Sequence, residues 1–241
     1  MDARSTRLLR RSALARRRRI KAWVWPILPA VLIAGWFYPV FGFVMLLCMG
    51  AAVGLAFYRG REWCDVCPRG AFYDLVVKRL GVERRIPRLV RTGGLRVLML
   101  GIMMTVMTVG LSRSWGDPAG MGRVFVMILI VTTVVGLAFA AFVNPRAWCS
   151  FCPMGSMAFA IGKGRYPMRV DAASCNDCGA CAKVCVMELD PAAYKREGSM
   201  AHGDCLKCVA CVAACPRGAL SFGEIAPPAP RAAERPDVAA A

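Results

Sequence analysis

The sequence predicts an α-helical membrane protein, with four transmembrane helices arranged as two repeated hairpins, followed by a small C-terminal α+β domain. Three observations lead to this prediction. Hydrophobic residues make up 57% of the chain although its formal net charge is +17, so apolar and charged residues must occupy different segments. The basic residues gather in a few of these segments. Eight of the 13 cysteines lie in two copies of one spacing near the C-terminus.

Residues 22–58 form the first apolar stretch, 37 residues without a single charge. One helix of that length would measure about 55 Å, whereas the hydrocarbon core of a bilayer is about 30 Å thick. We therefore expect two spans with a turn near Gly35 and Pro39, and the stretch is too long for the apolar part of a secretory signal. Residues 97–111 and 124–143 supply the third and fourth spans. Arg96 and Arg113, which flank the third, are expected to extend outward toward the membrane surface.

The basic residues predict the orientation of these spans. Of the 32 Lys and Arg, nine lie in residues 1–21, ten in 59–96, two between the third and fourth spans and eleven after the fourth. The positive-inside rule places both basic segments, and hence both termini, on the cytoplasmic side of a bacterial inner membrane. The charge of the N-terminal segment 1–21 is attributed to topology and lipid headgroups, and no nucleic-acid partner is expected.

The C-terminal cysteines form two runs with the spacing C-x2-C-x2-C-x3-C. In two-cluster ferredoxins the fourth cysteine of each run binds the cluster of the other run. The alternatives are a zinc site, which uses separated cysteine pairs, and a disulfide framework, which does not suit a cytoplasmic domain. Residues 164–223 are thus predicted to be a bacterial-type ferredoxin domain with two [4Fe–4S] clusters, and the tail 224–241 to be disordered. The predicted ligands are Cys175, Cys178, Cys181 and Cys215 for cluster 1, and Cys205, Cys208, Cys211 and Cys185 for cluster 2.

A second cysteine motif occurs twice within the predicted membrane domain, residues 22–163. The segments 61–70 and 146–155 align without a gap, and Arg, Trp, both Cys, Pro and Gly match. Two such motifs at one membrane depth predict a shared site, in which Arg61 and Arg146 offset the thiolate charge. A third iron–sulfur centre or a pair of redox thiols is expected there, and inert structural cysteines or a thioredoxin-like dithiol are the alternatives. The four cysteines are Cys64, Cys67, Cys149 and Cys152.

Few other side chains suggest chemistry. The only histidine, His202, is expected in a solvated loop, so a haem held by two histidines is excluded. Glu62, Asp65 and Asp74 lie beside the first motif, where they either pass protons during quinol chemistry or balance the neighbouring arginines. Cys48 lies in an apolar helix and is expected to act as a small hydrophobic residue. No catalytic residue is assigned, because no phosphate-binding loop or nucleophile–base pair is visible.

The whole pattern resembles the membrane-bound polyferredoxins of the NapH, NosR and MauN type. The resemblance covers about residues 22–222 and rests on the eight ferredoxin cysteines and on Cys64, Cys67, Pro68, Cys149, Cys152 and Pro153. The motif in that family is C-x3-C-P, whereas both copies in this chain are C-x2-C-P. The resemblance implies bacterial electron transfer at the cytoplasmic membrane, between the quinone pool and a partner redox protein.

The expected function is therefore that of a membrane-anchored iron–sulfur electron-transfer protein. Electrons would move between the quinone pool, or a membrane partner, and a cytoplasmic or periplasmic redox partner, as in a subunit of a quinol dehydrogenase. That partner would be another iron–sulfur protein or a periplasmic oxidoreductase component. The alternative is a membrane reductase that acts in the maturation of a metalloenzyme or cofactor. A redox-sensing regulator would need an output domain, and the sequence contains none that we recognise.

Overall fold

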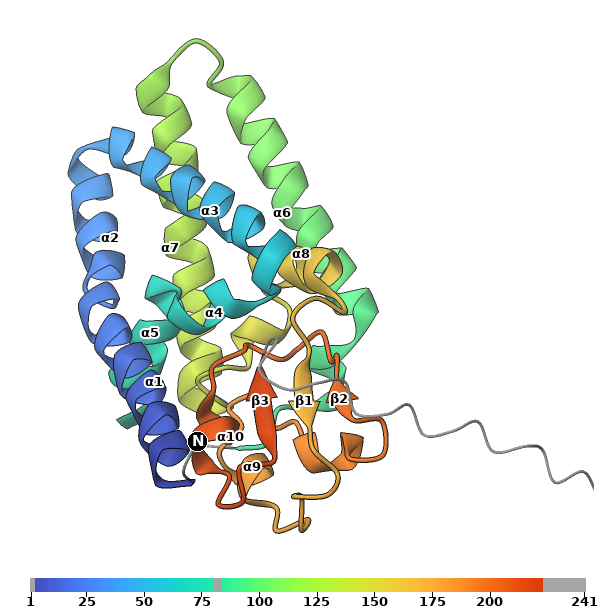
Figure 1. Ribbon diagram of the computed structural model, residues 1–241. Coiled ribbons are helices and arrows are strands. Elements are labelled where there is room, and N and C mark those ends of the chain that lie inside the picture. Colours follow the sequence, from blue (N-terminus) through green and yellow to red (C-terminus); the bar gives the residue numbers. More distant parts are fainter. Residues whose placement is uncertain (1–2, 80–83, 223–241) are drawn as a thin grey trace, which may run out of the picture.

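The computed structural model describes residues 3–79 and 84–222, so the tail predicted to be disordered lies outside the described residues. Within the described part, four helices are long and apolar enough to cross a membrane: Arg11–Phe37, Pro39–Arg59, Gly93–Arg113 and Pro118–Phe142. The chain is a multi-pass membrane protein with a small mixed domain at its C-terminal end (Figure 1).

The basic N-terminal segment is not separate from the first span but forms the beginning of it. Helix α1 (Ala3–Val24) is followed after Trp25 and Pro26 by α2 (Ile27–Phe37). The chain then turns through Tyr38 and the 3-10 helix η1 (Pro39–Gly42) into α3 (Phe43–Arg59). Pro39 has no backbone N–H to donate within a helix, which favours a break between α2 and α3. The uncharged stretch 22–58 is thus divided near the predicted position.

The second pair of spans consists of α6 (Gly93–Arg113) and α7 (Pro118–Phe142). The side chain of Asp117 caps α7 by accepting hydrogen bonds from the backbone N–H groups of Ala119 and Gly120. Helix α7 is the most buried of the four, because α2, η1 and α6 all pack against it. Gly42 and Gly122 allow η1 to approach α7 closely, since a Cβ on either glycine would collide with backbone of the other element.

Short helices follow α3 and α7 and carry the repeated cysteine motif. The first copy forms α4 (Glu62–Val66) and α5 (Pro68–Leu75), and the second forms η4 (Trp148–Ser150) and α8 (Pro153–Gly162). In both copies the cysteine before the proline is extended and the proline begins the next helix, a position where its missing N–H costs nothing. Two 3-10 helices, η2 (Val77–Arg79) and η3 (Arg88–Arg91), lie between α5 and α6.

The C-terminal domain is a three-stranded antiparallel sheet with two short helices. The strand order is β2 (Ser199–Met200), β1 (Met168–Val170) and β3 (Leu220–Phe222), and Met168 pairs with Met200 on one side and with Phe222 on the other. Helices α9 (Ala180–Lys183) and α10 (Ala210–Ala214) follow the two cysteine loops, and the 3-10 helix η5 (Pro191–Tyr194) lies between them in the chain. Met168, Met187, Met200 and Leu206 form the centre of the core.

This domain packs against the ends of the membrane helices (Figure 1). Arg91 donates hydrogen bonds to the Met187 carbonyl and the Glu188 carboxylate, and Glu188 also accepts from the Ile86 N–H. The prediction that Arg96 extends toward the membrane surface was wrong. This side chain is only 7% exposed, because it turns inward to Asp204 and stacks over the Phe159 ring. Arg113, at the other end of α6, is exposed.

Candidate metal centres

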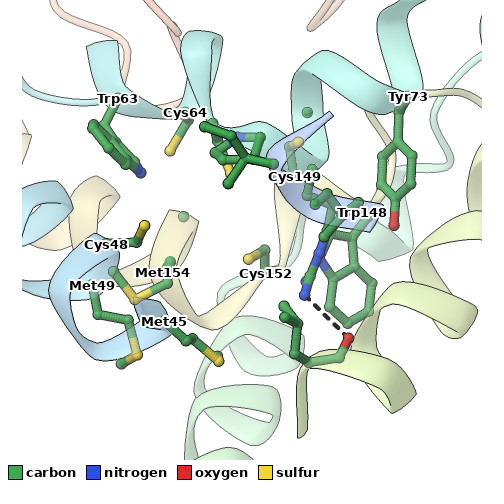
Figure 2. A pocket seen from close by; sticks show the side chains of 18 of the residues that line it. Met45, Cys48, Met49, Trp63, Cys64, Tyr73, Trp148, Cys149, Cys152 and Met154 are labelled. Carbon is green, nitrogen blue, oxygen red and sulfur yellow. Dashed lines mark hydrogen bonds between the residues drawn. The ribbon is translucent and has the colours of Figure 1, made fainter. Parts of the chain in front are cut away.

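The four cysteines of the membrane motifs line one cavity of about 150 Å³. Figure 2 shows Cys64, Cys149 and Cys152 around this cavity, and Met45, Met49 and Met154 also face it. The motifs are 85 residues apart in sequence, and the packing of α3 against α8 brings them together. The structure therefore supplies the shared location that the repeat predicts.

The arginines of the two motifs are exchanged between the copies. Arg61, from the first copy, donates a hydrogen bond to the Cys149 carbonyl, and Arg146, from the second, donates to the Cys64 carbonyl at 2.8 Å. Nη1 of Arg146 also lies 3.8 Å from Sγ of Cys149. Both guanidinium groups are almost fully buried, with relative exposures of 2% and 1%. Each copy thus supplies a cation that supports the other copy.

The matching glycines make room for this exchange. A Cβ on Gly70 would lie 2.5 Å from Nη1 of Arg146, and a Cβ on Gly155 would lie 2.8 Å from Nη2 of Arg61. Both distances are too short for a Cβ contact, so a larger residue at either position would displace the arginine. The glycines were visible in the repeat, but their role depends on a contact between copies that the sequence does not reveal.

The carboxylates beside the first motif are held in ion pairs. Asp74 accepts from Nε of Arg146 at 2.9 Å and from Lys21 at 2.9 Å, and Lys21 also contacts Asp65 at 2.6 Å. Arg17 pairs with Glu62 and Asp65. Burial alone would raise the pKa of Asp74, but Arg146 and Lys21 outweigh it and hold this pKa at about 2. Of the two roles expected for these acids, the ion pairs favour balancing the arginines.

Arg61 has a different partner, which lies in the C-terminal domain. Asp204 accepts from Nη1 of Arg61 at 2.7 Å and from Nη2 of Arg96 at 2.8 Å. His202 lies in a loop, as predicted, but it is half-buried beside this network, where its Nδ1 accepts the Asp204 N–H. Burial lowers the pKa of His202, which favours the neutral imidazole.

Two further features of the cavity were missed from sequence. Arg69 lines it and donates to Oγ1 of Thr132 at 2.8 Å, while its guanidinium lies over the buried Trp148 ring. The repeat gave no signal for Arg69, because Met154 occupies the matching position of the second copy. Cys48, treated as a simple hydrophobic residue, lines the same cavity from α3. Most of the other residues that line the cavity are apolar.

The eight ferredoxin cysteines line two smaller cavities. Cys175, Cys178, Cys181 and Cys215 surround one, and Cys185, Cys205, Cys208 and Cys211 surround the other. These are the crossed-over sets expected from the spacing. Each set offers three thiols from one loop and a fourth from the other run, which is the donor set of a cubane cluster. Within the described residues, no three His, Cys, Asp or Glu are grouped so that they could hold a single metal ion.

Two of the membrane cysteines meet the core of the C-terminal domain. Cys64 and Cys149 pack against this core, which contains Cys181 of the first set and Cys205 and Cys211 of the second. Burial raises the pKa of the Cys64 thiol to about 11, and the neighbouring Arg61 acts in the opposite direction. In the first set, by contrast, Cys178 is exposed. The three cysteine sets therefore extend from the membrane helices to the surface of the domain.

Comparison with known proteins identifies iron–sulfur domains in three places. Residues 41–87 and 122–166 both match one family model, described as a 4Fe-4S binding domain, and residues 174–220 match a 4Fe-4S dicluster domain. The chain is also similar to the "Uncharacterized protein MJ0749" of Methanocaldococcus jannaschii, with 23% identity over 210 residues that cover 80% of this chain and 81% of that protein. No solved structure matches. The chain is thus an iron–sulfur membrane protein with ferredoxin-type domains.

Proposed function

We propose that this chain is a membrane-anchored electron-transfer protein with two [4Fe–4S] clusters in its C-terminal domain and a third iron–sulfur centre at the membrane boundary. One observation carries the proposal: all four cysteines of the repeated membrane motifs line a single cavity, and two of them pack against the C-terminal domain. When bound, the clusters supply one-electron carriers whose potentials depend on burial and hydrogen bonding.

The arginines of the membrane motifs suit such a centre. A buried cage of thiolates is anionic, and an uncompensated buried charge is very costly. Arg61 and Arg146 bring two buried positive charges to the backbone of this site, and Arg69 brings a third to the cavity wall. Asp74 balances Arg146, whereas Asp204 is shared by Arg61 and Arg96 and balances only one of them. The positive charge that remains to oppose the thiolates therefore comes from the Arg61–Arg96–Asp204 group and from Arg69, and none of these side chains acts as a ligand.

The cavity wall is also suited to an apolar redox partner from the bilayer. Ile27, Leu28 and Val31 of α2 and Val44 and Met45 of α3 line it on the side of the membrane spans. A quinone, which dissolves in lipid, is the partner we propose for this side. A partner redox protein would exchange electrons at the exposed Cys178 end of the C-terminal domain.

We place the protein in a bacterial cytoplasmic membrane with both termini inside, among polyferredoxins of the NapH, NosR and MauN type. The distribution of arginines supports this orientation, since Arg113 and Arg123 alone lie near the turn between α6 and α7. The C-terminal domain then lies in the cytoplasm, where its free cysteines remain reduced and available for iron.

Iron and sulfide analysis after anaerobic purification tests the third centre. We expect about twelve irons per chain, because three cubanes bind about four each, and about eight after substitution of both Cys64→Ser and Cys149→Ser. Cys48→Ser is the matched control: this cysteine lines the same cavity but belongs to neither motif, so the count should stay at about twelve. A count of about eight that the double substitution leaves unchanged contradicts the third centre and leaves the ferredoxin clusters standing.

A further inference from the structure

A second and larger cavity, of about 930 Å³, has no ligand assigned by the proposed function. It is a cleft between α1, residues 84–85 before α6, residues 144–146 after α7, and the helices α9 and α10 of the C-terminal domain. We call it the basic cleft. Figure 1 shows α1 beside α10 at the end of the membrane helices, where this cleft lies.

Positive charge dominates the walls of the basic cleft. Its three acids are already engaged: Asp65 and Asp74 by Arg17, Lys21 and Arg146, and Glu188 by Arg91. Five other basic side chains of the cleft form no ion pair with a carboxylate of the described chain. These side chains are Arg11, Arg18, Arg84, Arg85 and Lys183, all of which are exposed.

Among the described side chains of α1, the arginines divide into two groups around the helix. Arg11, Leu14, Arg18 and Lys21 line the cleft, and their spacing of three and four residues places them on one face. Arg16 and Arg19 belong to the same helix and do not line the cleft. One face of α1 is therefore directed at the concavity, while other arginines of equal charge are not.

We infer that the basic cleft binds a phosphate-bearing anion. Guanidinium groups match phosphate oxygens in a two-pronged geometry, and at least four arginines without a carboxylate partner in the described chain face this space. The volume of the cleft lies within the range of about 300–1,000 Å³ that is typical of small-ligand sites. A lipid headgroup or a free phosphate compound therefore suits this cleft better than a protein partner with a flat surface does. The cleft also adjoins the ends of the spans Arg11–Phe37 and Pro118–Phe142, the level of lipid headgroups.

An anion in the cleft would lie beside the second ferredoxin cysteine set. Cys185 and Cys208 both line the cleft, and both also line the cavity of the predicted cluster 2. A negative charge at this position opposes the addition of an electron to cluster 2. Because the two events are thermodynamically linked, reduction of the cluster weakens anion binding in turn. This consequence rests on the proposed function, whereas anion binding itself does not.

Direct binding to the full-length purified protein tests the inference with two probes. Native mass spectrometry with phosphatidylglycerol, against phosphatidylcholine, reports a lipid headgroup. Calorimetric titration with inorganic pyrophosphate at constant ionic strength reports a soluble phosphate. We expect one of the two to saturate at one site per chain and to bind about 30-fold more weakly after Arg11→Gln with Arg18→Gln, since each basic residue contributes about 1 kcal/mol.

Two further variants make the result decisive. Arg16→Gln with Arg19→Gln removes the same charge from the same helix outside the cleft, and should leave binding unchanged. Arg84→Gln with Arg85→Gln removes it from the opposite wall, and should weaken binding as strongly as the α1 variant. Unchanged iron content in each variant checks that the chain folds. Equal losses in the cleft and control variants, no saturable binding of either probe, or tighter binding of polyglutamate than of both phosphates would overturn the inference.

Discussion

The two copies of the cysteine motif have nearly the same local structure but different electrostatic partners. In both, a buried arginine reaches across to the cysteine carbonyl of the other copy, and a glycine makes room for it. Arg146 is neutralised by Asp74 within the membrane domain, whereas Arg61 is neutralised by Asp204 of the C-terminal domain. One copy thus stabilises the membrane domain itself, and the other joins it to the domain that carries the ferredoxin cysteines.

The largest effect should come from Asp204→Asn. This change leaves Arg61 and Arg96 buried without a counter-ion, and breaking a buried pair costs about 3–5 kcal/mol. We expect a lower thermal midpoint for the detergent-solubilised protein, with the C-terminal domain loosened from the membrane helices. Asp177→Asn is the control, because its carboxylate is 60% exposed; it pairs with Lys195 and accepts a long hydrogen bond of 3.7 Å from the Cys175 thiol. Equal thermal midpoints for the two variants would mean that the ion pair between Arg61 and Asp204 does not hold the C-terminal domain to the membrane helices.

A smaller and symmetrical effect is expected from Gly70→Ala and Gly155→Ala. Each new methyl group would displace the arginine of the other copy, and overpacking of this kind costs about 1–3 kcal/mol. Thermal midpoints should fall in both variants by similar amounts. Gly54→Ala is the matched control: nothing lies within 4 Å of its Cβ position in α3, so the midpoint should stay or rise. A loss in only one of the two variants would show that the copies are not equivalent in packing.

Arg61→Lys and Arg146→Lys keep the charge but lose the planar fork, and their effect is followed at the clusters rather than in the thermal midpoint. Arg61 contacts both the Cys149 carbonyl and Asp204, which precedes Cys205, whereas Arg146 contacts only membrane-domain groups among the described residues. Electron paramagnetic resonance of the reduced protein should therefore change for cluster 2 in Arg61→Lys and stay unchanged for it in Arg146→Lys. The same cluster 2 spectrum in both variants would mean that Arg61 does not connect the two sites.

Sequence alone was sufficient for the features that depend on local pattern. A charge-free run of 37 residues cannot cross a bilayer once, so its division near Pro39 follows from length. The cysteine spacing likewise predicted which thiols share a cavity, including the crossed-over Cys185 and Cys215. The duplicated motif predicted that four more cysteines share one location, and they do.

Only the tertiary structure decided which charges meet. Arg61 and Asp204 are 143 residues apart, and Arg96, expected at the membrane surface, shares the same carboxylate. Nothing in the sequence distinguishes Asp204 from other acids of the C-terminal domain as a partner for Arg61. The basic cleft likewise exists only because α1 packs against α10. Hydropathy and ligand spacing act along the chain and can be read from it, whereas a buried ion pair depends on how two domains dock.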